Sequence, residues 1–402
     1  MSFGKRIELF FKGVLSFIIQ IFFKKQIRPP TPPYNRILFI RFDVLGDMII
    51  SLPVLRASRM NQPDSRIDII CSFRNNSIVQ PSGYVNNTYI TTKNPFRNIQ
   101  LIFQLRKKNY DLVVNLVTRP SLTYGIIAGF IGPNAVRVAS DQKSYEYFYT
   151  HIITLPPKSN IHITRRLLLL CSFLIDQKFD ALSQPWVVFS NDIKEKAKEL
   201  YQWILKQFKL NSESSKIVAV NLSAGLVRRD WTFKKFLEFL KIVVDKYDGI
   251  DGWVIFTNPV NPSESKRMVE LVANYKVISL PEIKDFKVLF EFLHYLYALV
   301  TPDTSFMHAA SATGTPELGL MAEEKVPEWG PLSSPHTVVE SKDPLRGTPS
   351  DPIRNAEEIA TPAKTPISKR EWFRRRAATD RAGAPGYPLL PTAGLRYTVG
   401  RA

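Results

Sequence analysis

The 402-residue sequence predicts an α/β protein made of two doubly wound, Rossmann-like domains, each a parallel sheet covered by helices. Three observations predict this fold class. From residue 36 onward, short apolar runs typical of buried strands alternate with helical patterns. The alternation occurs in two successive sets. Polar residues follow three of the apolar runs, at the strand ends where open α/β sheets bind ligands.

The first set predicts a domain over residues 34–188. Continuous apolar runs are typical of parallel strands buried on both faces. Such runs occur in RILFIRF, RIDIICS, YDLVVNLV and, more weakly, AVRVAS. Amphipathic or mixed segments separate them, DMIISLPVLRASRM reads as a helix, and HITRRLLLLCSFLI is expected to close the set as another helix.

The second set predicts a domain over residues 189–345. Its expected strands are KIVAVNLS, GWVIFT, KVISL, YALVTPD and GTPELGLM, and its clearest helices are WTFKKFLEFLKIVVDKY and KDFKVLFEFLHYL. Neither set carries a GxGxxG turn or a Walker lysine loop, which disfavours an ordinary dinucleotide or P-loop site. We expect the two domains to face a central cleft at their strand carboxyl ends.

Charge is concentrated at the two ends of the chain. The formal net charge is +18, and the first thirty residues hold six Lys and Arg against one acid. Residues 346–402 hold eleven Lys and Arg against five acids. Such ends suit an anionic membrane surface. No zinc-finger spacing, RNP motif or basic zipper is present, so no nucleic-acid partner is expected. The two cysteines form no metal-ligand pattern.

The two terminal segments are interpreted separately from the domains. In residues 1–28, polar residues recur every fourth position within an apolar stretch, which predicts an amphipathic helix lying in a membrane interface. A membrane span and packing on the protein itself are the alternatives, and no secretory cleavage site precedes Lys24. The tail 346–402 is basic, Pro-rich and without an apolar period, so disorder is expected there.

Three segments at strand ends carry the residues that suggest chemistry. RFDVLGD (41–47) places two carboxylates around a glycine, at the end of a strand and the start of a helix. NLSAGLVRRDW (221–231) opens a strand into small residues followed by two arginines. TPDTSFMHAASATGTP (301–316) begins with typical N-cap residues. Backbone amides in a small-residue turn and at a helix N-terminus favour anions, and an arginine adds charge.

These three segments, with YDLVVNL and the Leu52-Pro53 pair, occur in an order that resembles glycosyltransferase family 9, the ADP-heptose:lipopolysaccharide heptosyltransferases. The resemblance runs from about residue 36 to 331. It implies a GT-B fold with an acceptor-binding first domain and a nucleotide-sugar-binding second domain. It also implies inversion at the anomeric carbon without a metal or another cofactor. The residues agree on the metal, since the sequence has no DxD pair and no histidine cluster.

On the acceptor side, the resemblance implies that Asp47 is the catalytic base and that Arg41, Asp43 and Gly46 bind the acceptor. An inverting transfer needs one base that takes the proton of the attacking hydroxyl. Asp47 as a simple helix N-cap is the alternative. Many relatives have Ser at the position of Asp43, which therefore has an acceptor or structural role in this interpretation.

On the donor side, the implied residues belong to the second and third segments. They are Ser223, Ala224, Gly225, Arg229, Trp231, Asp303, Thr304, Ser305 and His308. Arg229 and the amides around 224–225 and 304–305 are expected to offset the diphosphate charge. The alternatives are an ion pair with a surface acid for Arg229, core packing for His308 and helix-start packing for Trp231.

The sequence thus predicts an inverting, metal-independent glycosyltransferase that moves a heptose or related sugar from a nucleotide-diphospho-sugar to a lipid-linked saccharide. ADP-heptose and lipopolysaccharide core are the expected substrates. The expected location is cytoplasmic, peripheral to the inner membrane. The alternative is a catalytically inactive nucleotide- or glycan-binding member held at the membrane as an assembly partner. The sequence departs from the family pattern in ways that bear on this alternative: Ser305 replaces a usual glycine, and the segment after Pro316 is more charged than the apolar strand that the family has there. The tail is also unlike the closing helix of the family.

Overall fold

The computed structural model describes residues 27–158, 161–175, 183–211, 214–223, 231–257, 261–322, 325–332 and 335–341. Residues 1–26 of the predicted amphipathic helix and the whole tail 346–402 lie outside these ranges. The described residues all belong to one compact unit. Within the described ranges, no helix is both long and apolar enough to cross a membrane.

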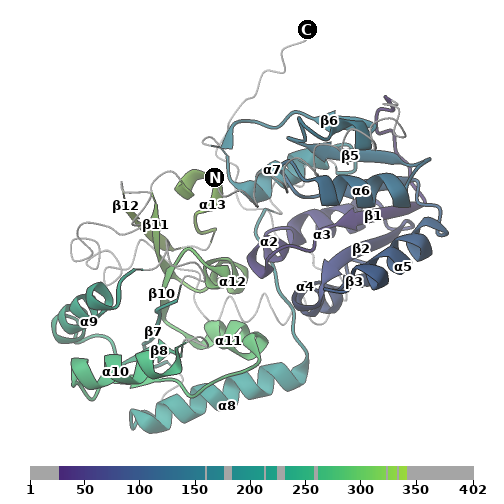
Figure 1. Cartoon of the computed structure of the whole chain (residues 1–402). Coiled ribbons are helices and arrows are strands. Elements are labelled where there is room, and N and C mark those ends of the chain that lie inside the picture. Colours follow the sequence, from purple (N-terminus) through teal and green to yellow (C-terminus); the bar gives the residue numbers. More distant parts are fainter. Residues whose placement is uncertain are drawn as a thin grey trace. The chain divides into compact units, whose positions relative to one another are not determined.

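The first half of the chain forms a six-stranded parallel sheet in the order β3-β2-β1-β4-β5-β6 (Figure 1). Its strands are β1 (Arg36–Ile40), β2 (Arg66–Ser72), β3 (Asn87–Thr91), β4 (Leu112–Asn115), β5 (Val136–Ser140) and β6 (His151–Ile153). Its helices are α2 (Leu45–Ile49), α3 (Leu52–Asn61), α4 (Phe73–Val79), α5 (Pro95–Arg106), α6 (Leu122–Ile131) and α7 (Ile163–Leu170).

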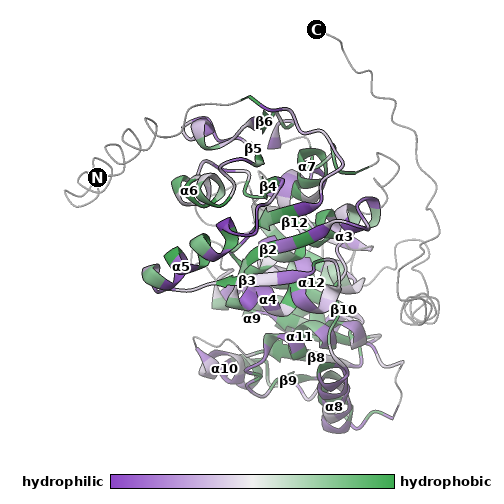
Figure 2. Cartoon of the chain, turned by 90° about the vertical axis from the view of Figure 1, so that its right-hand side faces the viewer, coloured by the Kyte–Doolittle hydropathy of each residue, from purple (hydrophilic) through white to green (hydrophobic). Residues whose placement is uncertain are grey.

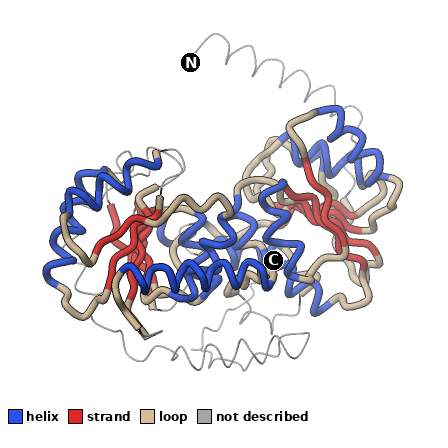
Figure 3. Tube along the Cα trace, turned by 90° about the horizontal axis from the view of Figure 1, so that it is seen from below, coloured by secondary structure: helices blue, strands red, loops and turns tan. Residues whose placement is uncertain are grey.

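The second half repeats the plan in a six-stranded parallel sheet of order β12-β11-β10-β7-β8-β9. Its strands are β7 (Ile217–Asn221), β8 (Gly252–Phe256), β9 (Val277–Ser279), β10 (Ala298–Pro302), β11 (Glu317–Ala322) and β12 (His336–Ser341). Its helices are α8 (Asn191–Gln207), α9 (Phe233–Lys246), α10 (Pro262–Val272), α11 (Phe286–Phe292), α12 (Ser305–Thr313) and α13 (Val326–Trp329). Figure 3 shows the strands as two groups with helices packed around them.

Each sheet is buried on both faces, which explains the continuous apolar runs in its central strands. In β1, Ile37 and Phe39 belong to one core cluster, whereas Leu38 and Ile40 belong to another. This division follows from the alternation of side chains along a strand. The cluster with Ile37 also includes Met48 of α2 and Ala309 of α12, so one apolar core continues from the first half into the second.

The helix predicted after β1 is divided in two. α2 ends at Ile49, and α3 begins at Leu52 with Pro53 in its first turn. Proline lacks the backbone N–H that a continuous helix would need at this position, but it is well tolerated in a first turn. The break leaves α2 as a separate short helix that carries Gly46 and Asp47.

Both sheets have a switch point, where the strand order reverses. In the first sheet, β1 lies between β2 and β4, and in the second, β7 lies between β8 and β10. Loops leave the carboxyl ends of the two strands at such a point in opposite directions, which opens a ligand-binding crevice. The predicted site residues follow β1, β7 and β10, so the topology places them at the two switch points.

Candidate functional site: two strand switch points

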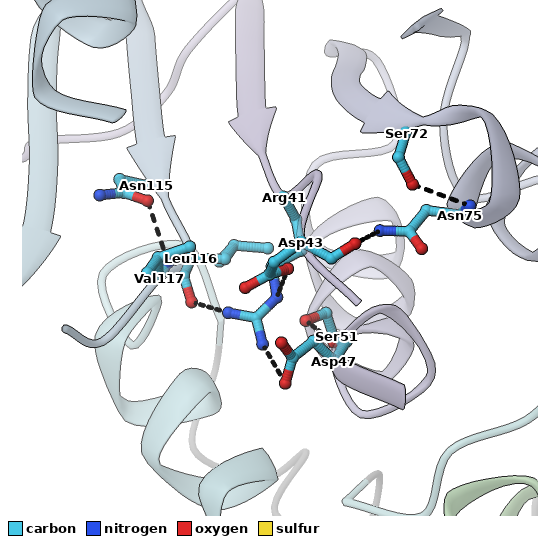
Figure 4. A network of polar contacts seen from close by, with 9 residues as sticks. All are labelled: Arg41, Asp43, Asp47, Ser51, Ser72, Asn75, Asn115, Leu116 and Val117. Atoms are coloured by element: carbon cyan, nitrogen blue, oxygen red, sulfur yellow. Dashed lines mark hydrogen bonds and ion pairs between the residues drawn. The ribbon is translucent and has the colours of Figure 1, made fainter. Parts of the chain in front are cut away.

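The first switch point is organised by one buried guanidinium, that of Arg41 (Figure 4). Its Nε lies 3.2 Å from Asp43 Oδ1, and its Nη2 lies 3.2 Å from Asp47 Oδ1. Its Nη1 donates a hydrogen bond of 2.5 Å to the carbonyl of Leu116, just beyond β4. Arg41 therefore joins the ends of β1 and β4 and holds both carboxylates of the first segment at one point.

The two carboxylates of this site are only slightly exposed. Asp43 is 10% exposed and Asp47 is 16% exposed, whereas Arg41 is 3% exposed. The pKa of Asp43 is raised to about 7, mainly by burial and also by the neighbouring Asp47, although the Arg41 charge acts in the opposite direction. One arginine cannot fully compensate two neighbouring carboxylates at low solvent access. Asp43 therefore takes up a proton much more readily than an exposed aspartate.

Asp47 is not the N-cap of its helix. The N-cap residue of α2 is Val44, whose side chain makes no capping hydrogen bond, and Asp47 lies in the first turn. The main chain before the helix is fixed instead from α4, where Asn75 Nδ2 donates to the Asp43 carbonyl at 3.2 Å. Simple N-capping therefore does not account for Asp47.

The second switch point is organised by Asn221 at the end of β7. Its Nδ2 donates to Thr301 Oγ1 at 3.0 Å and to the carbonyl of Ser223 at 3.1 Å. Its Oδ1 accepts from the Ser223 N–H at 3.2 Å. The same amide group lies 3.4 Å from Thr304 Oγ1. Asn221 thus ties the start of the small-residue loop to β10 and to the beginning of α12.

The third segment forms the N-terminus of α12, as expected. Thr304 is its N-cap, with Oγ1 accepting from the Phe306 N–H at 3.1 Å, and Ser305 is the first helical residue. Asp303 precedes the cap. His308 is 6% exposed and lies directly against Gly46 of α2, where a Cβ atom would be 2.8 Å from His308 Cδ2. The structure therefore brings the first and third segments into contact at these two residues.

Trp231 has a different environment from the other predicted donor residues. It is 2% exposed, and its ring packs edge-on against Phe236 and Phe239 at centroid distances of 4.8 and 5.9 Å. This is the helix-start packing named as its alternative. A direct donor contact of Trp231 stays a prediction. Ala224, Gly225 and Arg229 lie outside the described residues, so their donor roles also stay predictions.

Sequence reasoning missed several polar residues that shape the two switch points. Asn115 ends β4, where its Nδ2 donates to Tyr149 Oη at 2.8 Å and its Oδ1 accepts from the Val117 N–H. Asn221 has the corresponding position at the end of β7. The available signal was an asparagine that ends an otherwise apolar strand, in LVVN and IVAVN. A polar side chain buried at such a position requires partners, and only the fold supplies them.

His162 is a partly buried residue near the contact between the halves. Its Nε2 lies 3.0 Å from the carbonyl of Gly330, and its Nδ1 accepts from the Thr164 N–H. Burial and, to a smaller extent, the neighbouring His308 lower the pKa of His162 to about 4, against the raising effect of the Gly330 hydrogen bond. His162 is therefore neutral near pH 7 and donates through Nε2. In the described ranges, no three His, Cys, Asp or Glu side chains converge as metal ligands.

Comparisons with known proteins support the architecture. The family model "Glycosyltransferase family 9 (heptosyltransferase)" matches residues 99–350, more than half of the chain. The Arg41–Asp47 segment lies before this range. No curated protein sequence matches.

Solved structures with a similar fold include three bacterial proteins. A glycosyl transferase family 9 protein from Veillonella parvula has 17% identity and a TM-score of 0.65, covering 87% of this chain and 97% of that one. E. coli ADP-heptose lps heptosyltransferase II has 18% identity, a TM-score of 0.59 and coverages of 81% and 98%. E. coli heptosyltransferase WaaC with ADP has 16% identity, a TM-score of 0.58 and coverages of 80% and 98%. These likenesses show the GT-B fold.

Proposed function

The chain belongs to glycosyltransferase family 9, the heptosyltransferase family, and we propose that it transfers a heptose or related sugar from a nucleotide-diphospho-sugar to a lipid-linked saccharide. ADP-heptose is the proposed donor, and lipopolysaccharide core is the proposed acceptor. Support for the donor comes from the similar E. coli heptosyltransferase described with ADP and with ADP-2-deoxy-2-fluoro heptose. The proposed location is the cytoplasmic face of the inner membrane, held by residues 1–28.

The observation that carries the proposal is the placement of Asp47 beside Arg41 at the first switch point. Asp47 is partly open to solvent, and the Arg41 Nη2 atom 3.2 Å away orients its carboxylate. A base on the acceptor side is what an inverting displacement requires. In the proposed reaction, Asp47 takes the proton of the acceptor hydroxyl while that oxygen bonds to the anomeric carbon. The nucleoside diphosphate leaves from the opposite side with the electron pair of the broken bond.

Asp43 has a supporting part in this proposal. Its raised pKa, about 7, means that it holds a proton for part of the time near neutral pH. While Asp43 is protonated, the Arg41 charge acts mainly on Asp47. Asp43 and Gly46 border the proposed acceptor position, and Arg41 orients both carboxylates there.

The second half supplies the proposed donor site. Amides at the N-terminus of α12, after the Thr304 cap, favour the negative charge of a diphosphate. Ser223 is held by Asn221 next to this helix start. The remaining charge compensation is assigned to Arg229 and the amides of residues 224–225. No step of this proposal requires a metal ion.

The test is turnover of a nucleotide-sugar panel with lipid-A-core acceptors, followed through release of nucleoside diphosphate. Asp47→Asn keeps the shape of the side chain but removes its basicity, so turnover should fall by about 10²–10⁴. Donor binding should change little. Asp43→Asn is the paired variant and should cost clearly less. Near-wild-type turnover of Asp47→Asn would contradict the assignment, and saturable donor binding without any release would support the inactive alternative.

A further inference from the structure

The outer side of α5 carries an apolar row that the glycosyltransferase site does not use. Phe96, Ile99 and Phe103 are 75%, 49% and 60% exposed, and Phe130 of the adjacent α6 is 41% exposed. On the opposite side of α5, Leu105 is fully buried in the core of the first half. We call Phe96, Ile99 and Phe103 the α5 face. Figure 2 shows α5 at the margin of the first half, with hydrophobic and hydrophilic residues along it.

The segment that carries the α5 face is basic throughout. Residues 93–108 contain five basic residues and no acid: Lys93, Arg97, Arg106, Lys107 and Lys108. Arg106 Nη1 donates to the Phe130 carbonyl at 2.9 Å, which fixes the end of α5 against α6. Exposed aromatic side chains that are flanked by cations, with no acid in the segment, complement a surface that has anionic groups on its outside and an apolar interior beneath them.

A hollow of about 660 Å³ adjoins the α5 face. Its lining includes Phe103, Arg106 and Lys107 together with Pro133 and Asn134. Asp111 also lines the hollow. Its Oδ2 accepts from the N–H groups of residues 35 and 36 at 2.9 Å each, so backbone donors already compensate its charge. The hollow therefore offers cations and polar groups to an anionic headgroup.

The N-terminal part of the chain joins the body beside this hollow. Arg28 Nη1 donates to the carbonyl of Asn134 at 3.1 Å, and the Arg28 N–H donates to the carbonyl of Thr150 at 3.2 Å. Residues 1–26, which lead to Arg28, hold five basic residues against one acid. A membrane that receives this segment thus meets the protein at the rim of the hollow.

We propose that the α5 face and the adjoining hollow are a docking surface for an anionic lipid bilayer. Phe96, Ile99 and Phe103 enter the interfacial region, while the flanking Lys and Arg side chains contact lipid phosphates. Charge complementarity selects this occupant. Residues 1–26 are themselves basic and would repel the cations around α5, whereas an anionic bilayer attracts both. This inference rests on the membrane location proposed above, but it requires neither donor nor acceptor.

The experiment measures binding of the full chain to vesicles by co-sedimentation. Vesicles of phosphatidylcholine with about 30% phosphatidylglycerol are compared with pure phosphatidylcholine, at low and high salt. Phe96→Ser/Phe103→Ser removes the apolar anchors, and Arg97→Gln/Lys107→Gln removes two cations. Tyr275→Ser, at an 85% exposed aromatic residue of the second half, and Lys241→Gln/Lys266→Gln, at exposed lysines of α9 and α10, are the matched controls.

Each α5 variant should lower the partition coefficient on anionic vesicles by about tenfold or more. The controls should stay within about twofold of the wild type. High salt should weaken the wild type and largely remove the defect of the Arg97/Lys107 variant. Thermal melting of each variant checks that the fold is retained.

Three results would overturn the proposal. Wild-type binding by both folded α5 variants would mean that the α5 face does not touch the bilayer. Stronger binding by Phe96→Ser/Phe103→Ser would mean that residues 1–26 cover the face and are released by the substitution. A wild-type dimer in light scattering that this variant converts to a monomer would identify a second copy of the chain as the occupant.

Discussion

Replacing Asp43 with asparagine should remove a specific pH dependence from the stability of the protein. The folded-state pKa of Asp43 is about 7, whereas an unfolded aspartate has a pKa of about 3.9. The folded chain therefore holds this proton more tightly than the unfolded chain. The resulting contribution to stability is fully present below about pH 4 and is lost as pH rises toward 7.

The expected magnitude follows from the size of the shift. Each pKa unit corresponds to about 1.4 kcal/mol, so three units give an upper bound of about 4 kcal/mol. Between pH 5 and pH 8 the free energy of unfolding of the wild type should fall by about 3 kcal/mol through the ionisation of Asp43. Most of this fall occurs below the folded-state pKa, and little remains above it. A loss of this size lowers the melting temperature of a large domain by roughly 5–10 °C. Asp43→Asn cannot ionise and should lack this part of the decline.

The assay is a series of thermal melts of the wild type and Asp43→Asn from pH 5 to pH 8 at constant ionic strength. Groups away from this site titrate equally in both proteins, so the difference between the two curves isolates Asp43 together with its coupling to Asp47. Asp64→Asn, at an exposed aspartate, is the matched control and should follow the wild type. Parallel curves for Asp43→Asn and wild type would show that Arg41 already compensates the Asp43 charge, and would refute the argument.

Two further predictions concern Gly46, where α2 meets α12, and Arg229, which is proposed to bind the donor. Gly46→Ala places a Cβ atom 2.8 Å from His308 Cδ2. We therefore expect the free energy of unfolding, measured by chemical denaturation, to fall by about 1–3 kcal/mol, and the donor KM to rise. Gly249→Ala is the control and should change neither quantity, because a Cβ atom at residue 249 meets nothing within 4 Å. Arg229→Ala removes a proposed charge-assisted bond to diphosphate, so donor affinity in calorimetry should fall by about tenfold or more while acceptor affinity is retained. An equal loss for both ligands would make Arg229 structural.

The central strands of both sheets and the edge strand β9 were predictable from the sequence, whereas the other edge strands were not. Strands β1, β2, β4, β7, β8 and β10 are apolar runs because both of their faces are covered. By contrast, β3 is only partly buried along its length, and β6 has three partly buried residues. An edge strand is paired on one side only and needs no continuous apolar run. β3, β6 and β12 were therefore missed, although they complete the sheets.

The site was predictable as three separate segments but not as an arrangement. Strand ends and helix starts gave the positions of Asp43, Asp47 and Thr304 along the chain. Arg41 lies between the two carboxylates, and it also donates a hydrogen bond to the carbonyl of Leu116, which follows the neighbouring strand β4 and is 75 residues away. Asn221 likewise finds its partners across 80 residues. Such long-range partners depend on sheet order, which local patterns do not encode.

The contact between Gly46 and His308 shows how the two halves meet at the proposed chemistry. Gly46 immediately precedes Asp47 in α2, and His308 lies one helical turn after the Thr304 cap of α12. Because residue 46 has no side chain, α12 packs so close to α2 that the His308 ring lies against Gly46. This packing places the N-terminus of α12, which is proposed to hold the donor phosphates, near α2, which carries the proposed base Asp47. Gly46, which the sequence suggested as an acceptor contact, is in the fold also the residue that permits α2 and α12 to pack closely together.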